Sequence, residues 1–594
     1  AGIIIAPKDL SELIPVFASK ETDLCITQIE GSIIEDSGVI KMDFLGLKTL
    51  TVISNAEKFV RRDFKPDFDI EDIDYNDQNV YQMISEGTTV GVFQLESSGM
   101  QDLCKRIKPG SIDDITAINA LYRPGPMGSG MHLEFAEIKN KINGKVESYP
   151  FEEVKPVLKD TYGIIVYQEQ VMNIARVVAG YSLGQADMLR RAMGKKKAEE
   201  MQRHKEIFRK GAIERGFDED KAIALFDLME KFAEYGFNKS HAVAYSVVAY
   251  QTAFLKRYYP AQFFAALLGT EINNKEKITA YIQEAKEFDI SILPPDVNES
   301  LWLFNVIGNT IRFGLGAVKG VGEGAVEEIV RERTENGPFT GFVDFCERVN
   351  LKSVNKRVLE ALIKVGAFDS CEKFNRKTLL DNMEFIVAFA EKKQEEKLMG
   401  QTSLFDMGEV QQSSEEQLNI AESAEFDEKQ KLSLEAQLLG IYVSGHPLFR
   451  FKDIMDKLTS MNLAQIQELP TVSRPEGFNP RMGDEHDPSK RSVVIAGMIT
   501  ESKVILTKKG DKMAFVTLED LHGKIECLFF PKIFAEFQQF LTIDEPLILN
   551  GYVNLAEDVK KFFPTKISLL KDESEDRVTS VRVNVPLNHL HPYS

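Results

Sequence analysis

The sequence predicts a multidomain α+β protein with four parts: a partial sheet domain, a large mainly helical domain, a smaller domain with a hairpin between helices, and a five-stranded β-barrel. Three observations support this fold class. The 594 residues are enough for about four domains at roughly 150 residues each. Long amphipathic segments fill residues 76–290, whereas short β-type runs fill residues 493–569. The composition, 43% hydrophobic and 27% charged, indicates folded domains with a large core.

The first 75 residues alternate β-rich runs with a helical stretch. The β-rich runs are residues 2–6 and 39–44, and the amphipathic stretch is residues 49–62. This pattern indicates an α/β layer, so we expect part of a sheet domain here.

Residues 76–290 carry the apolar spacing of amphipathic helices. Gly180 can end one helix in the left-handed conformation, and Ser182 can cap the next. The expected helices include residues 168–179, 198–215, 222–235 and 242–258.

A break at Leu293-Pro-Pro295 starts the remaining modules, which begin with a strand pair near residues 303–313. Gly-rich text between two helical runs follows, and then an acidic linker. The five β-like runs after residue 493, with a helix near residues 533–540, predict a barrel of the oligonucleotide-binding type. Because the chain starts without Met and stops soon after a β-like run at residues 581–585, we expect a fragment.

Composition excludes several classes of protein. No run of 18 apolar residues occurs, so a membrane span and a membrane partner are not expected. The five cysteines form no CxxC pair and the histidines no HExxH motif, which excludes a zinc ribbon and a zinc hydrolase and suits a reducing, cytoplasmic location. No GxxxxGK[ST] loop is present, which argues against a small-molecule phosphotransferase.

Charge is unevenly distributed along the chain. The net charge is −19, which argues against a nucleic-acid coat over the whole surface. Residues 186–210 nevertheless carry nine Lys/Arg against four Asp/Glu, whereas residues 406–430 carry one against eight. Positive charge is therefore localised.

Two polar groups could carry phosphate or metal chemistry. Asp43 ends a β-rich run, where a carboxylate can bind a metal or merely cap the following helix. Arg190 and Arg191 can bind phosphate bidentately, although a solvated basic helix is the plainer alternative. On that helix Arg191 and Lys195 share a face, while Met188, Leu189 and Met193 can reach the core.

A Gly-Phe-Asn turn precedes the helix expected near residue 242, with Ser240 and His241 at its start. Helix N-termini bind anions through free N–H groups, but Ser240 could be a simple cap and His241 a buried side chain. Residues 121–126 similarly predict a rigid turn that presents Tyr122 and Arg123.

Six strings occur together in one order, and on them the sequence resembles the alpha subunit of bacterial DNA polymerase III, a family C replicative polymerase. The resemblance covers essentially the whole chain. The strings are MDFLGLKTLT (42–51), VFQLESSGM (92–100), ALYRPGPM (120–127), YGIIVYQEQVM (162–172), ADMLRRAMGKKK (186–197) and YGFNKSHAVAY (235–245).

The resemblance implies a palm domain in which three aspartates hold two Mg²⁺ ions, with Asp43 as the catalytic and metal-binding third aspartate. The family's other two aspartates lie upstream of the DFLGL string, so Asp67 and Asp69, which lie downstream, are not expected to be ligands. The pair is missing here, together with the family's amino-terminal domain. Two-metal phosphoryl transfer needs both ions about 3.5–4 Å apart, so this chain alone should be inactive.

The resemblance also implies contacts with the incoming nucleotide and with DNA. The nucleotide-binding candidates are Lys41, Arg190, Arg191, Asn238, Ser240 and His241. Arg123 and Lys195 are the DNA-binding candidates that the resemblance implies. The residues themselves add Gly320 and Gly322, which fit the hairpin of a helix-hairpin-helix and let a phosphate approach closely, and Lys508 and Lys509 in the barrel, which could bind a single-stranded template. Phe515 and Phe529 could stack on bases but are expected to belong to the core.

Within the acidic linker, Gln401-Thr-Ser-Leu404-Phe405 has the form of a peptide that binds a sliding clamp. Leu404 and Phe405 would fill an apolar pocket, and the Gln401 amide would bind at its rim. The family has a clamp motif at this place.

We therefore expect the following domains. Residues 1–75 are the end of the palm, 76–290 the fingers, 291–405 the helix-hairpin-helix and clamp-binding domain, 406–490 the acidic linker and connecting segment, 491–570 the oligonucleotide-binding fold, and 571–594 the start of a truncated domain.

The expected function is template-directed DNA synthesis in chromosomal replication, as part of a DNA-directed DNA polymerase. The expected partners are primer–template DNA, dNTP, the sliding clamp and other subunits of the polymerase III holoenzyme. The alternative is a non-catalytic DNA- and clamp-binding scaffold derived from the polymerase.

Overall fold

The structure is a computed structural model of the chain. It describes residues 2–20, 23–195, 198–233, 236–398, 418, 420–443, 445, 447–467, 469–472, 487, 489–507, 509–541, 546–556 and 560–570, without the side chains of 193–195, 198–199, 233 and 397–398. The chain forms two compact units. The first is Ala1–Ile292 with Leu303–Gly314, and the second is Leu293–Trp302 with Leu315–Ser594.

The amino-terminal segment contains two small antiparallel sheets. Strand β1 (Gly2–Ile5) pairs with β4 (Ile40–Asp43), and β2 (Val16–Phe17) pairs with β3 (Ile26–Thr27). A small apolar cluster formed by Ile14, Ile34 and Val39 lies beneath them. Helix α1 (Lys48–Asp63) follows and packs against α13. The expected sheet domain is thus represented by two separate strand pairs in the described residues.

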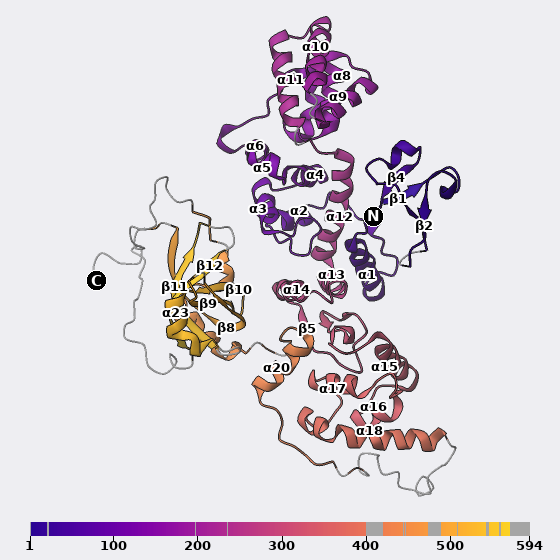
Figure 1. Ribbon diagram of the computed structural model, residues 1–594, viewed down its shortest axis with the longest axis vertical. Helices are drawn as coiled ribbons and strands as arrows, with labels where there is room; N and C mark the ends of the chain where they lie inside the picture. Colours follow the sequence, from indigo (N-terminus) through magenta and orange to yellow (C-terminus); the bar gives the residue numbers. More distant parts are fainter. Residues whose placement is uncertain are drawn as a thin grey trace, which may run out of the picture. The chain divides into compact units, whose positions relative to one another are not determined.

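Helix α12 is the central element of the first unit (Figure 1). It packs against α4, α2 and α13, and Tyr250 and Ala253 on it are fully buried. The helices of this part are α2 (Gln78–Ser85), α3 (Ser98–Ile107), α4 (Ile112–Leu121), α5 (Pro124–Gly128), α6 (Met131–Lys139), α12 (Lys239–Tyr258), α13 (Pro260–Thr270) and α14 (Lys275–Glu287). The short helix α7 (Lys155–Leu158) packs against α8 (Gln168–Ala179) instead.

Helices α8 (Gln168–Ala179), α9 (Leu183–Lys195), α10 (Ala198–Glu214) and α11 (Glu219–Ala233) pack on one another around a second core (Figure 1). Gly180 ends α8 with φ 70°, and the Ser182 hydroxyl accepts a hydrogen bond from the Gln185 N–H at 3.2 Å. Both observations confirm the expected boundary, because only a residue tolerant of positive φ can close the helix there.

A short sheet and a group of helices follow. The sheet has the order β5-β7-β6 and confirms the expected strand pair. The group includes the long helix α18 (Figure 1). The elements are β5 (Ser291–Leu293), β6 (Asn305–Ile307), β7 (Thr310–Arg312), α15 (Glu323–Asn336), α16 (Phe342–Arg348), α17 (Lys356–Lys364), α18 (Arg376–Leu398) and α20 (Glu428–Leu439).

The last described module is a closed five-stranded barrel of order β10-β12-β11-β8-β9. Closure leaves no free sheet edge. Helix α23 lies between the third and fourth strands in the sequence, α21 packs against β8, and α22 packs against β10. The elements are α21 (Lys452–Leu458), α22 (Leu463–Gln467), β8 (Lys490–Leu506), β9 (Lys512–Glu519), β10 (Lys524–Phe529), α23 (Pro531–Phe537), β11 (Pro546–Asn554) and β12 (Lys561–Leu569).

Among the described residues, every helix is too short or too polar to cross a bilayer.

Candidate nucleotide- and DNA-binding site

The start of α12 joins segments that lie far apart in the sequence. The Gln168 N–H donates a hydrogen bond to the Phe237 carbonyl at 2.9 Å, and Tyr167 forms a parallel β-bridge with Phe237. The Glu169 carboxylate accepts from the Lys239 N–H at 2.9 Å. The YQEQ and GFNKSH strings therefore form one continuous structure.

Asn238 caps α12. Its backbone is extended, with φ −75° and ψ 119°, and its side-chain oxygen accepts from the His241 N–H at 2.8 Å. The alternative that Ser240 caps this helix is wrong, because Ser240 already lies inside the first helical turn. Ser240 and His241 are both exposed in the first turn of α12. A helix N-terminus favours an anion, and the Glu169 carboxylate already occupies part of this one, because it accepts from the Lys239 N–H.

Aromatic rings continue from the α12 start along the surface. The Phe237 and His241 rings lie 5.6 Å apart, His241 and Tyr245 4.2 Å, and Tyr245 and Phe93 5.2 Å, measured between centroids. The Arg123 guanidinium lies 4.9 Å from the Phe237 ring centroid. Arg123 is exposed, so this stacking holds a cation at the surface next to the helix N-terminus.

Arg190 and Arg191 both bind one carboxylate. Arg190 donates to Asp187 at 2.8 and 3.0 Å, and Arg191 donates to the other oxygen at 2.8 Å. These hydrogen bonds hold the pKa of Asp187 below its usual range, and the bond from Arg190 has the largest effect. Arg190 also donates to the Gln168 side chain at 3.4 Å. A phosphate would therefore have to compete with Asp187 for guanidinium groups that are already oriented.

The rest of α9 corrects one expectation. Leu189 is fully buried, as predicted, but Met188 is 57% exposed. The prediction that Met188 reaches the core is wrong, because the helix turns that position outward. Lys195 ends α9, and its side chain and that of Met193 lie outside the described part.

Asp43 lies at the end of β4, directly opposite Gly2 of β1. Its side chain is 74% exposed, and Oδ1 lies 3.6 Å from the Lys41 Nζ. A Cβ at Gly2 would lie 2.9 Å from the Lys41 Cε, so glycine leaves room for this pair. Asp43 does not cap α1, whose N-cap is Leu47.

The described residues contain no group of three or more His, Cys, Asp or Glu side chains that could hold a metal ion. Asp43 offers one oxygen ligand of the type that Mg²⁺ prefers, but the set is incomplete. Asp69 accepts from the Glu71 N–H at 2.9 Å and caps a short 3₁₀ helix, Ile70–Asp72. A structural role thus accounts for Asp69, whereas Asp67 is simply exposed.

The Gly-rich hairpin leads into α15. Gly320 has φ 95°, a conformation that favours glycine, and Gly322 is the N-cap of α15. A Cβ at Gly322 would meet nothing within 4 Å, so a ligand backbone can approach closely. Lys319 and Arg357 are exposed near this turn, which suits contact with phosphate.

The barrel residues divide between the two faces of its wall. Phe529 is fully buried in the barrel core, as expected. Phe515 is only partly buried on the outer face, so the expectation that it belongs to the core is wrong. Lys509 is exposed in the β8–β9 loop. Lys508 and the clamp candidates Gln401, Leu404 and Phe405 lie outside the described residues.

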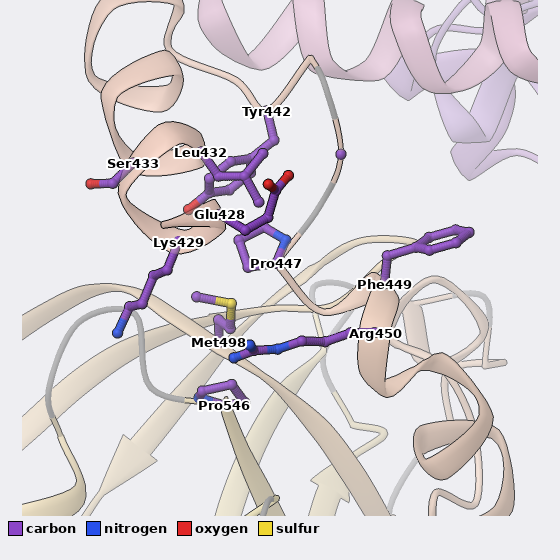
Figure 2. Close-up of a pocket in the computed structure, with 11 residues that line it drawn as sticks. Glu428, Lys429, Leu432, Ser433, Tyr442, Pro447, Phe449, Arg450, Met498 and Pro546 are labelled. Atoms are coloured by element: carbon purple, nitrogen blue, oxygen red, sulfur yellow. The ribbon is translucent and has the colours of Figure 1, made fainter. Parts of the chain in front are cut away.

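A cavity of about 260 Å³ lies in the second unit between α20, the segment after it and the barrel. Its lining includes Leu432 of α20, Tyr442 and Pro447 of the segment after it, and Met498 and Pro546 of the barrel strands (Figure 2). The described residues that line this mainly apolar cavity include none of the predicted site residues.

Comparison with known protein families places these features in one class. A model of the bacterial DNA polymerase III alpha NTPase domain matches residues 1–46, and a model of the finger domain of the same subunit matches residues 49–216. A helix-hairpin-helix model matches residues 289–379, and an OB-fold nucleic acid binding domain matches residues 493–570. Together they define a modular nucleic-acid-binding protein with polymerase domains.

Three curated relatives identify the family, and each is named DNA polymerase III subunit alpha. The Borreliella burgdorferi protein is 40% identical over 100% of this chain and 50% of the relative. The Aquifex aeolicus protein is 43% identical over 94% of the chain and 44% of the relative, and the Escherichia coli protein 39% identical over 94% and 47%. The chain belongs to the bacterial DNA polymerase III alpha subunit family and spans about half the length of these relatives.

Sequence reasoning missed three parts of this site: the Asp187 carboxylate, the Gln168 amide and the aromatic rings of Phe93, Phe237 and Tyr245. Asp187 lies three and four residues before the arginines, a spacing that predicts ion pairs on a helix. The Phe93–Tyr245 contact carries no such local signal, because it joins positions more than 140 residues apart. Phe237, His241 and Tyr245 are spaced four residues apart, and that spacing could have indicated neighbouring rings.

Proposed function

We propose that this chain is the part of a replicative DNA polymerase that holds the incoming dNTP and the primer–template DNA. The complete protein performs template-directed DNA synthesis by transfer of a nucleotide to a primer 3′-hydroxyl. The observation that carries this proposal is the convergence of five of the six strings at the start of α12, through the contacts of Arg123, Gln168, Arg190 and Tyr245.

The cations of this region suit a triphosphate. Arg190 and Arg191 present two planar guanidinium groups whose orientation Asp187 fixes in advance. If phosphate oxygens replaced the Asp187 carboxylate, the two guanidinium groups would keep their hydrogen bonds. The same groups would then neutralise negative charge of the nucleotide. Ser240 and His241 lie in the first turn of α12, where the positive end of the helix dipole favours a phosphate.

Arg123 and Lys195 are proposed DNA contacts beside this centre. The Arg123 guanidinium is held over Phe237 and leaves its edge for a phosphate or a base. The Gly320–Gly322 turn would hold the DNA backbone without reading sequence, because its two glycines expose backbone and the Val321 side chain between them is buried. Lys508 and Lys509 of the barrel would follow a single-stranded template.

Asp43 is the proposed metal ligand of the palm, with Lys41 next to it on the same strand face. The described residues do not complete a metal site. We infer that the site needs two further aspartates, which the family has upstream of the DFLGL string. When Mg²⁺ is bound, it would stabilise the negative charge of the reacting phosphates. Within this chain, Lys41 adds positive charge beside the Asp43 carboxylate.

We also propose that residues 401–405 bind the sliding clamp and that other holoenzyme subunits bind the complete protein. The domain boundaries expected from the sequence, with the palm up to residue 75 and the fingers up to residue 290, form part of this proposal.

Steady-state primer extension tests the nucleotide site in a protein that is extended to the length of its relatives. We expect Arg190→Ala and Arg191→Ala to raise the KM for dNTP roughly tenfold or more, by loss of charge-assisted hydrogen bonds. Arg215→Ala is the control, because Arg215 caps the end of α8 away from the α12 start through the Val177 carbonyl. Equal KM values in all variants would exclude this nucleotide site, and complete inactivity of the extended parent would favour the non-catalytic scaffold.

A further inference from the structure

Three aromatic rings form a continuous stripe on the outer wall of the barrel. Tyr552 of β11 and Phe563 of β12 have centroids 5.1 Å apart and planes inclined by 11°. Phe530, directly after β10, lies 5.8 Å from Phe563 at 19°. The Lys490 Nζ of β8 lies 4.6 Å from the Tyr552 ring centroid. We call Tyr552, Phe563 and Phe530 the aromatic stripe.

Strand register explains why these rings point away from the core. Tyr552 and Phe563 are directly paired partners, so their side chains share a face. Their neighbours Val553 and Phe562 are fully buried and fill the barrel interior. Phe530 is 46% exposed. The core is therefore filled without the stripe, and burial inside this module does not account for three aligned rings on its surface.

Positive charge accompanies the stripe. Lys490 lies at its Tyr552 end, and Lys561 lies two residues before Phe563, on the same face of β12. The Lys561 Nζ is 3.1 Å from the Glu526 carboxylate. A ligand with flat rings and negative charge fits this arrangement of rings and cations.

We propose that the aromatic stripe binds the bases of a single-stranded nucleic acid, while Lys490 contacts its phosphates. Bases stack on exposed aromatic side chains regardless of sequence, and a neighbouring cation follows the backbone. Duplex DNA does not fit, because its bases are already stacked within the helix. The site combines the first, fourth and fifth strands with Phe530 directly after the third strand, whereas Phe515 and Lys509 belong to the second strand and the loop before it.

This site is separate from the nucleotide site at α12 and needs no polymerase activity. It would hold a single strand on a second face of the barrel, in addition to the second- and third-strand face that oligonucleotide-binding folds commonly use. Its failure in the experiment below would therefore leave the proposed function intact.

A tryptophan reporter tests the site directly in the 594-residue chain. Trp302 is the single tryptophan of the chain, so Trp302→Phe supplies a dark background for Phe530→Trp. We expect oligothymidylate to quench the new emission in a saturable manner. An abasic oligomer of equal length and charge should quench it much less, and so should duplex DNA. Unchanged emission with oligothymidylate would overturn the proposal.

Affinity measurements identify the ring contribution. Phe530→Leu with Phe563→Leu keeps apolar side chains but removes the exposed ring at the end of the stripe and the ring on which it stacks. By fluorescence anisotropy we expect a loss of roughly fivefold or more for oligothymidylate and little change for the abasic oligomer. Phe385→Leu on α18, where Phe385 is 53% exposed, is the matched control. Lys490→Gln should weaken both probes and reduce the salt dependence.

Two results would contradict the stripe as a nucleic-acid site. The first is equal oligothymidylate affinity of the double variant and the parent, with unchanged circular dichroism. The second is altered self-association of the double variant in sedimentation at unchanged affinity, which would assign the stripe to a contact between protein chains.

Discussion

Among the described residues of the first unit, Lys256 of α12 is the most deeply buried cation, and it offers a quantitative test of the packing of this unit. Its side chain is fully buried, and its Nζ lies 2.6 Å from the Glu284 carboxylate of α14. The same Nζ donates to the carbonyls of Thr88 and Val90 at 3.1 and 2.8 Å. Lys256 therefore ties α12 to α14 and to the loop before α3.

Glu284→Gln removes the charge but keeps the size and an acceptor oxygen. Loss of one partner from a buried pair costs about 3–5 kcal/mol. We expect about 3 kcal/mol here, since two carbonyl acceptors remain on Lys256. At roughly 1.4 kcal/mol per tenfold, that equals about a hundredfold increase in the population of the locally open state.

The effect depends on pH in a defined direction. Burial lowers the pKa of Lys256 below its usual range, with the Glu284 charge opposing this shift. The unfolded chain therefore binds more protons between the lowered and the ordinary lysine pKa, and stability rises with pH in that window. Glu284→Gln lowers the pKa further, so its stability deficit should shrink as pH rises toward about 10.

Hydrogen exchange read by mass spectrometry suits this test, because a chain with several modules has no single unfolding free energy. Peptides from α12 and α14 should exchange about a hundredfold faster in Glu284→Gln. The exposed Glu287 of the same helix provides the control variant Glu287→Gln. Equal protection in Glu284→Gln and the parent, or a deficit that grows with pH, would refute the reasoning.

Three further perturbations have defined outcomes. Asn238→Ala should lower stability by about 1 kcal/mol through loss of the α12 cap, and an unchanged melting temperature would contradict this. Gly551→Ala would place a Cβ against the Phe563 carbonyl oxygen. We therefore expect the unfolding free energy of the barrel, measured in urea, to fall by about 1–3 kcal/mol. An unchanged unfolding free energy would show that the strand can shift to make room. Asp187→Asn should strengthen binding of inorganic triphosphate roughly threefold by calorimetry, because the carboxylate no longer competes for Arg190, whereas weaker binding would mean that Asp187 only positions the arginine.

Local signals predicted much of the fold. Helix α8 has the bounds expected from its apolar period, because Gly180 closes it with a positive φ that other residues rarely adopt. The barrel was recognisable because period-two runs alternate with turn residues. The outward direction of Phe515 was not predictable from alternation alone, since the phase of an alternating strand is set by its partners.

The sequence strings predicted which residues belong to the site, but they did not predict which of these residues contact one another. Arg190, Arg191 and Arg123 stand out by their chemistry, yet Phe237 contacts Arg123 across more than 100 residues and leaves no local pattern. Asn238, and not Ser240, caps α12. The sequence could not decide between them, because both residue types suit an N-cap and only the backbone angles show which residue occupies it. Asp69 shows the reverse problem, because an acidic residue that caps a turn resembles a metal ligand in sequence.

The central claim is that Asp43 belongs to the metal site of a DNA polymerase, whereas Asp69 is structural. Primer extension with Mg²⁺, in the protein extended to the length of its relatives, tests this claim most directly with Asp43→Asn and Asp69→Asn side by side. The account predicts loss of extension in Asp43→Asn, unchanged binding of primer–template DNA, and near-parental activity in Asp69→Asn. Extension that survives in Asp43→Asn, or is lost in Asp69→Asn at unchanged stability, would contradict it.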